Sequence, residues 1–225
     1  MHADRHILAI NASYRDGGVT DRIVDLMADE LRERNVDVEI VKLREHPIEF
    51  CLNCRECMQS PGEKAGTCVL NDGMHELIEK IEAADGYVFA SPINFSSATA
   101  LFKRFSERLA PFGYWPWGAL APVFRKDKAA KKPAILVSSC GAPGILGRLS
   151  FMSLRELRIA ARTIGARSRG SLLTGLVSGE PHPTLSPRTE RAARRLTGRL
   201  AGRPATRRPP RLNAGAAYPE VCSSH

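Results

Sequence analysis

Apolar and polar residues alternate along the chain with two different periods, which predict strands and helices in turn. Ile7 to Ile10 form an uninterrupted apolar run, as is typical of a strand buried on both faces. After it, Ile23, Leu26, Met27 and Leu31 recur at helical spacing. An apolar run followed by a helical pattern recurs along the chain. It predicts five strands, at 6–11, 37–43, 85–91, 133–139 and 168–174. It also predicts five helices, at 19–34, 73–83, 97–109, 148–164 and 186–201.

Strict alternation of strands with helices favours an α/β fold built on one parallel sheet. Neighbouring parallel strands need a crossover connection, and right-handed crossovers cover both faces of the sheet with helices. We therefore expect a doubly wound, five-stranded parallel sheet in the order 2-1-3-4-5. Two segments fit neither period, a cysteine-bearing loop at 44–72 and an irregular stretch at 110–132.

The net charge of +9 belongs mainly to the end of the chain. Nine of the 33 basic residues follow Ser186 and only two acidic residues oppose them, so this segment alone carries +7. Residues 203–225 are rich in Pro, Arg, Ala and Ser without apolar periodicity, which is typical of disorder. The chain therefore divides into one domain at 1–202 and a basic tail at 203–225.

Composition otherwise fits an ordinary globular domain, with 43% hydrophobic and 25% charged residues. No apolar run approaches the roughly 20 residues that span a bilayer, and no long apolar segment precedes the first strand. We therefore expect a cytoplasmic protein without a membrane span. In that compartment six cysteines indicate thiols, metal ligands or redox chemistry, because structural disulfides are rare there.

Three of the predicted strands end in loops rich in small and polar residues. These loops are Asn11–Thr20, Ser91–Ser97 and Ser138–Gly144. Ligands of open α/β sheets bind outside the carboxyl ends of the strands, so three such loops in order indicate a binding crevice. The first loop, with its hydroxyls and Arg15 at a helix start, suits a terminal phosphate. A capped surface turn without a ligand is the alternative for any one of them.

At this point the chain resembles a known family, the flavodoxin-like NAD(P)H-dependent FMN reductases, including the iron–sulfur flavoproteins. The resemblance covers roughly residues 5 to 200. It rests on the motifs at Ser13–Thr20, Cys51–Cys57, Cys68–Met74, Ala84–Phe95 and Leu101–Arg108. The chain departs from the family pattern at Tyr14, Asn53, Gly73 and Asn94, where relatives usually carry Pro, Gly, Asp and Tyr.

The resemblance implies three groups of FMN-binding residues. The phosphate group would be held by Ser13, Arg15, Gly18, Val19 and Thr20. The edge of the flavin ring would face Pro92, Ile93, Asn94, Phe95 and Ser96, with Phe95 on or beside the ring. A third wall would consist of Ser139, Cys140 and Gly141, in which Cys140 is a small buried side chain rather than a nucleophile.

Four cysteines in one loop leave several interpretations open. Two residues separate Cys51 from Cys54 and Cys54 from Cys57, and ten residues separate Cys57 from Cys68. Four thiolates suit a [4Fe–4S] cluster, and zinc is the tetrahedral alternative. Iron–sulfur flavoproteins use the same triple with a shorter final gap, whereas other relatives keep similar cysteines as structural thiols or a labile disulfide.

The resemblance implies an FMN-dependent oxidoreductase that passes electrons from NAD(P)H through the flavin to a quinone, a flavin, a similar small acceptor or a partner protein. No side chain is expected to act as general acid or base. Family members commonly form homodimers or tetramers, and Trp115 and Trp117 could cover the flavin, join subunits or pack internally. One alternative is an electron-transfer or redox-sensing flavoprotein without its own NAD(P)H turnover. Another, which we do not favour, is nucleic-acid binding through the arginine tail.

Overall fold

The central element is a parallel sheet in which the five long strands follow the predicted order. The computed structural model describes residues 5–129, 131–144, 151–177, 179 and 184–201. Strand order is β2-β1-β3-β7-β8, which in chain order of these five is 2-1-3-4-5, and all four pairings are parallel. The strands are β1 (His6–Asn11), β2 (Asp37–Lys42), β3 (Gly86–Asn94), β7 (Lys132–Ser139) and β8 (Ala166–Thr174).

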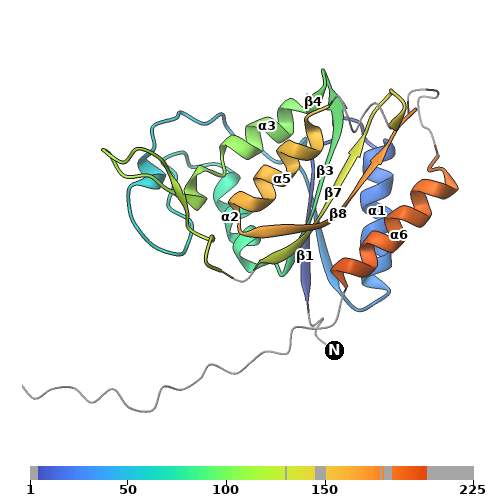
Figure 1. The fold of residues 1–225 in the computed structure, drawn as a ribbon, viewed down its shortest axis with the longest axis horizontal. Helices are drawn as coiled ribbons and strands as arrows, with labels where there is room; N and C mark the ends of the chain where they lie inside the picture. Colours follow the sequence, from blue (N-terminus) through green and yellow to red (C-terminus); the bar gives the residue numbers. More distant parts are fainter. Residues whose placement is uncertain (1–4, 130, 145–150, 178, 180–183, 202–225) are drawn as a thin grey trace, which may run out of the picture.

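Helices cover both faces of this sheet (Figure 1). One face packs against α1 (Val19–Arg32) and α6 (Pro187–Leu200). The other packs against α2 (Met74–Ala83), α3 (Ala100–Glu107) and α5 (Ser153–Thr163). The doubly wound α/β fold is therefore confirmed.

Each face has its own apolar core because neighbouring strand residues point to opposite sides. In β1, Ile7 contributes to the α1/α6 core, whereas Leu8 contributes to the core under α2, α3 and α5. On the second side Phe89 lies 6.3 Å from the rings of both Phe102 and Phe105. Burial of three aromatic side chains here stabilises α3 against the sheet by several kcal/mol, at roughly 2–3 kcal/mol each.

The prediction that a helix begins at residue 97 was wrong. A short strand, β4 (Ser97–Ala98), pairs antiparallel with the end of β3, so residues 92–98 form a hairpin. The helix begins after Thr99, whose hydroxyl accepts a hydrogen bond from the Phe102 amide at 3.3 Å. The Thr99 hydroxyl also donates to the Ala12 carbonyl at 2.8 Å, which ties the helix start to the loop after β1.

The two irregular segments contain short elements and lie together at one end of the molecule (Figure 1). The cysteine loop includes the 3-10 helix η1 (Glu56–Met58), and η2 (Ala110–Phe112) precedes the strands β5 (Gly113–Tyr114) and β6 (Val123–Phe124). The predicted tail at 203–225 and the first residues of the predicted helix 148–164 lie outside the described residues. Among the residues described, no helix is long and apolar enough to cross a bilayer.

Candidate functional site

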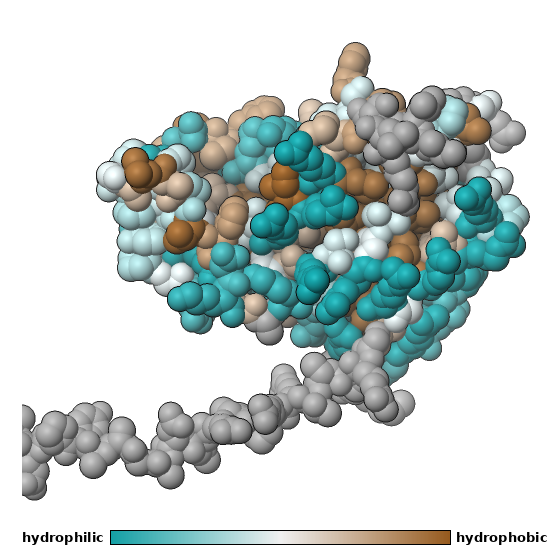
Figure 2. Space-filling model, in the orientation of Figure 1, coloured by the Kyte–Doolittle hydropathy of each residue, from teal (hydrophilic) through white to brown (hydrophobic). Residues whose placement is uncertain are grey.

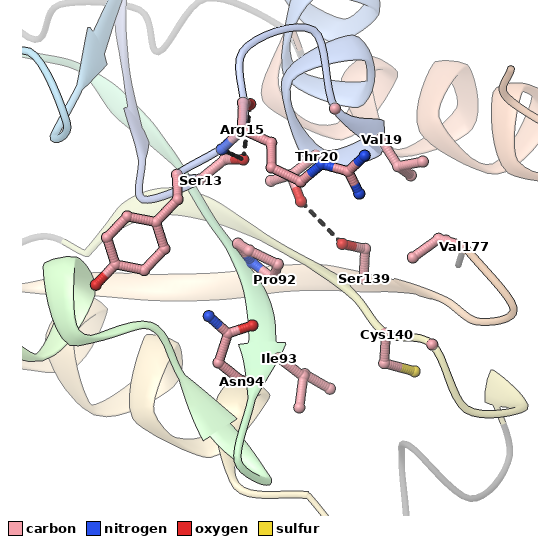
Figure 3. Close-up of a pocket in the computed structure, with 13 residues that line it drawn as sticks. Ser13, Arg15, Val19, Thr20, Pro92, Ile93, Asn94, Ser139, Cys140 and Val177 are labelled. Carbon is pink, nitrogen blue, oxygen red and sulfur yellow. Dashed lines mark hydrogen bonds between the residues drawn. The ribbon is translucent and has the colours of Figure 1, made fainter. Parts of the chain in front are cut away.

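A cavity of about 210 Å³ lies where the loops after β1, β3 and β7 meet (Figure 3). Eleven of the thirteen residues that the resemblance assigns to the FMN site line it. They are Ser13, Arg15, Gly18, Val19, Thr20, Pro92, Ile93, Asn94, Ser139, Cys140 and Gly141. The other two, Phe95 and Ser96, lie at the hairpin tip beside the cavity instead of on its wall. The structure thus brings together the three loops that the sequence singled out.

The loop after β1 folds tightly around its own hydroxyl. The Ser13 Oγ accepts from the Arg15 amide at 3.2 Å and donates to the Arg15 carbonyl at 3.1 Å. Gly17 adopts a φ of +62°, which favours glycine. A Cβ on Gly18 would stand 3.2 Å from the Cβ of Arg15, so any larger residue there would press on the Arg15 side chain.

Helix α1 begins at this loop without a side-chain cap. Its N-cap residue is Gly18, which has no side chain to pair with the first amides. Because the amide dipoles at a helix start favour negative charge, the combination of uncapped amides, hydroxyls and Arg15 suits an anion. In Figure 3 the Arg15 side chain extends beside Val19 at the rim of the cavity.

A buried hydrogen bond joins the first and third loops across the cavity floor. The Thr20 and Ser139 hydroxyls lie 2.9 Å apart, and both residues are almost fully buried (Figure 3). On the same wall the Cys140 amide donates to the Thr174 carbonyl at 2.9 Å, and the Val177 amide donates to the Cys140 carbonyl at 3.2 Å. The loop after β8 thereby adds Val177 to the site.

The hairpin between β3 and β4 is strained at its tip. Phe95 and Ser96 have φ values of +48° and +66°, although neither is glycine. Each left-handed residue of this kind costs about 1 kcal/mol or more. Two contacts from α5 hold the hairpin base, since Glu156 accepts from the Ser97 hydroxyl at 2.8 Å and the Ala98 amide at 2.7 Å. Phe95 itself is fully exposed, and Figure 2 shows an apolar projection at this edge.

The four loop cysteines line a second, much smaller cavity of about 30 Å³. All four are free thiols. Burial, followed by the neighbouring Cys68, Cys51 and Cys54, raises the pKa of Cys57 to about 11. Within the described part of the chain, no group of three or more His, Cys, Asp or Glu side chains is placed to hold a single metal ion.

A buried ion pair between Arg108 and Asp72 stabilises this cysteine loop. The Arg108 guanidinium, 1% exposed, donates to both Asp72 carboxylate oxygens, at 2.6 and 3.0 Å, and to the Cys68 Sγ at 3.5 Å. It also donates to the Glu49 carbonyl at 2.8 Å. Burial alone raises the pKa of Asp72, but the hydrogen bonds from Arg108, Glu49 and Met74 outweigh it and lower that pKa to about 2.

The two tryptophans do not line the central cavity. The Arg55 guanidinium lies between them, 3.8 Å from the centre of the Trp115 ring and 4.5 Å from that of Trp117. Arg55 also donates to the Trp115 carbonyl at 2.8 Å. In this chain the aromatic segment therefore packs on the cysteine loop, which agrees with the internal-packing alternative.

Two cavity residues were not among the predicted cofactor contacts: Tyr14 and Val177. Tyr14 stands next to predicted contacts, so proximity in the sequence was a usable signal for it. Val177 lies beyond the last strand and reaches the cavity through the loop after β8, for which the sequence held no signal.

Comparison with known proteins gives a family match over most of the chain. The model of the family described as NADPH-dependent FMN reductase matches residues 5–164. An iron–sulfur flavoprotein of Archaeoglobus fulgidus is 31% identical over 109 residues, which cover 48% of this chain and 47% of the relative. The chain thus aligns with about half the length of the curated relatives that it matches.

Similarity to solved structures supports the fold. An NAD(P)H:quinone oxidoreductase from Methanothermobacter marburgensis superposes with a TM-score of 0.60 at 18% identity, covering 88% of this chain and 97% of that one. An FMN-dependent NADH-azoreductase from Bacillus anthracis, solved in complex with FMN, gives 0.59 at 12% identity, covering 87% and 99%. At such low identities these matches establish the architecture alone.

Proposed function

Because the chain belongs to the NADPH-dependent FMN reductase family, we propose that its central cavity binds FMN. We propose further that the protein passes electrons from NAD(P)H through the flavin to a quinone, a free flavin or a similar acceptor. The observation that carries this proposal is the convergence of the three loops on one cavity with a cationic, hydroxyl-lined end. Each of these loops comes from a different strand of the sheet.

The phosphate end of FMN fits the loop after β1. Ser13, Arg15 and Thr20 offer two hydroxyls and a guanidinium, and Gly18 leaves the space that a Cβ would otherwise occupy. Charge-assisted hydrogen bonds from a guanidinium to a phosphate are stronger than neutral ones, so Arg15 is the main determinant of phosphate affinity.

The flavin ring fits the open side of the cavity, next to the β3–β4 hairpin. A volume of about 210 Å³ is smaller than the roughly 300–1,000 Å³ typical of sites that enclose a whole ligand. The phosphate and ribityl arm therefore occupy the cavity and the ring lies at its mouth, along Pro92, Ile93 and Asn94. Phe95 and Ser96, on the hairpin tip, then border the ring instead of lying beneath it.

When bound, FMN supplies hydride acceptance and the release of electrons singly or in pairs. The chain's own residues orient the group and leave one face of the ring open to NAD(P)H and the acceptor. Asn94 offers an amide to the polar edge of the ring, and Ser139 and Gly141 lie on the wall formed by the loop after β7. We assign no side chain as a general acid or base.

The test is steady-state NADPH oxidation by the FMN-loaded protein with a water-soluble quinone. We expect turnover that requires FMN and that falls at least tenfold at limiting FMN in Arg15→Gln. The matched control is Arg32→Gln on α1, whose surface partner is Asp29 at 3.1 Å; it leaves turnover unchanged. Flavin that is reduced only by a chemical reductant, without NADPH or NADH turnover, would favour the electron-transfer alternative.

A second candidate function concerns the cysteine loop, which we propose as the holder of a [4Fe–4S] cluster that exchanges single electrons with the flavin. Support comes from the four free thiols around one cavity, Cys51, Cys54, Cys57 and Cys68. A tetrahedral zinc ion is the alternative occupant of the four thiolates.

Iron and acid-labile sulfide analysis after anaerobic reconstitution tests this second proposal. We expect about four irons and four sulfides per chain, and their loss in Cys54→Ser. Cys140→Ser is the control, because Cys140 lies in the other cavity. Protein that retains neither iron nor sulfide after reconstitution would leave the loop as a structural thiol site.

A further inference from the structure

A buried carboxylate lies directly beside the proposed phosphate cradle. Asp21, in the first turn of α1, is 2% exposed. Its oxygens accept a hydrogen bond from the Asn11 side-chain amide at 2.7 Å and another from the Gly17 backbone amide at 3.1 Å. The adjacent residue, Thr20, lines the cavity itself. Asp21 thus fixes the shape of the loop after β1 and at the same time places a negative charge next to the phosphate cradle.

One arginine from a distant part of the chain offsets that charge. Arg44 follows β2, and its guanidinium lies 3.0 Å from one Asp21 oxygen and 3.3 Å from the other. The same guanidinium donates to the Ser13 carbonyl at 3.2 Å and to the Asp16 carboxylate at 2.6 Å. Its side chain is 13% exposed, so solvent screens these contacts little.

Four of the contacts of Arg44 fall on the segment that forms the phosphate cradle, and a fifth joins its Nε to the exposed Glu45 carboxylate at 3.3 Å. Asp16 is 84% exposed at its side chain and is solvated without help, whereas Asp21 is 3% exposed and depends on partners inside the protein. Arg22 also contacts this loop, through a hydrogen bond to the Gly17 carbonyl at 2.9 Å. That bond is to a neutral group, so it holds the loop without neutralising the carboxylate.

We propose that Arg44 is a positioning residue that sets the preference for phosphorylated flavin, by neutralising Asp21 beside the phosphate cradle. A buried carboxylate without a cation would repel a phosphate dianion far more than it repels a neutral hydroxyl. Riboflavin ends in such a hydroxyl and therefore feels little of this charge. The inference rests on the proposed FMN site, which it refines by naming a residue that discriminates between two forms of the same flavin.

The test compares dissociation constants for FMN and riboflavin, measured by quenching of flavin fluorescence on the apoprotein. In Arg44→Gln we expect FMN affinity to fall on the order of tenfold, and riboflavin affinity by less than about twofold, since only one ligand carries the phosphate charge. Arg34→Gln is the matched control, because Arg34 pairs with Glu30 on α1, away from the cradle.

A double variant separates charge from loop shape. Asp21→Asn combined with Arg44→Gln removes both charges, so we expect the FMN-to-riboflavin preference to return to within about threefold of the wild-type value. If Arg44→Gln alone does not fold, Arg44→Lys retains the charge and should retain the preference. A wild-type protein that binds neither flavin would refute the proposed FMN site itself. If Arg44→Gln leaves both affinities unchanged, or lowers the affinities for FMN and riboflavin by the same factor, the role of Arg44 is refuted while the FMN site stands.

Discussion

Replacing Arg108, the residue that follows α3, with methionine should destabilise the protein more than any surface change in that helix. The substitution removes a buried guanidinium but keeps a side chain of similar length. Asp72, 9% exposed at its side chain, would then keep only the backbone amides of Glu49 and Met74 as partners. The Glu49 carbonyl and the Cys68 sulfur would also lose a donor.

The size of the expected loss in stability follows from the pKa of the Asp72 carboxylate. The pKa of Asp72 is about 2, against roughly 3.9 in an unfolded chain, so its hydrogen bonds and charge partner contribute on the order of 2.5 kcal/mol at neutral pH. Removing one partner of a buried pair costs about 3–5 kcal/mol in general. Since two amides still bind the carboxylate, we expect a loss near the lower limit, about 3 kcal/mol.

The stability that the Asp72 carboxylate contributes should decrease as the pH falls. A carboxylate whose folded pKa lies below its unfolded value contributes stability above the unfolded pKa and loses it as pH falls through the folded pKa. The contribution of Asp72 to wild-type stability should therefore disappear between about pH 4 and pH 2. In Arg108→Met the Asp72 carboxylate lacks its cation, so protonation of Asp72 removes an uncompensated charge from the folded variant. The difference in the free energy of unfolding between wild type and variant should therefore become smaller below about pH 4.

Urea denaturation at pH 7 and at pH 3 measures both effects. Arg104→Met is the control, since Arg104 lies in the last turn of α3, just before Arg108, and its one described ring contact is with Phe50, at 5.7 Å. We expect the control to change the free energy of unfolding by less than about 0.5 kcal/mol. A loss below about 1 kcal/mol in Arg108→Met, or one of equal size at both pH values, would contradict the stabilising role of the Arg108–Asp72 pair.

Three further predictions concern the hairpin, the cradle and the thiols. Ser96→Gly should raise the free energy of unfolding by about 1 kcal/mol in thermal melts, because glycine tolerates the φ of +66°; no gain would contradict the strain. Gly18→Ala should weaken FMN binding several-fold with little change in the melting temperature, because its Cβ would press on Arg15. At pH 8 iodoacetamide should alkylate Cys57 after Cys51, by mass spectrometry, because the thiolate of Cys57 forms only near pH 11; earlier labelling of Cys57 would contradict this.

Apolar runs were sufficient to predict the sheet, because strands buried on both faces differ strongly from their surroundings. They were insufficient at the end of β3. A two-residue hairpin turn normally carries Asn or Gly, and here Phe95 and Ser96 occupy those positions. Nothing local therefore marked a turn, and Ser97 was as good a helix cap by residue type as Thr99. The tertiary hydrogen bond from the Thr99 hydroxyl to the Ala12 carbonyl favours Thr99 as the cap, and this contact is visible only in the folded structure.

The residues that line the cavity could be predicted from the sequence. The buried arginines that stabilise the surrounding loops could not. Small residues at three strand ends identify the wall because the carboxyl ends of parallel strands meet at one edge. Arg44 and Arg108 contact carboxylates more than twenty residues away in the sequence, at Asp21 and Asp72. Such ion pairs leave no periodic signal, so both arginines emerge only from the fold. The homodimer or tetramer, the flavin contacts and the metal ligands stay predictions.

The most direct test of the proposed flavin site is a titration of the purified apoprotein with FMN, followed by flavin fluorescence and absorption. We expect saturation at one FMN per chain, with weaker binding in Arg15→Gln and normal binding in Arg32→Gln. Absence of saturable binding, or equal binding by Arg15→Gln and the wild type, would contradict the claim that the three loops form a flavin phosphate site.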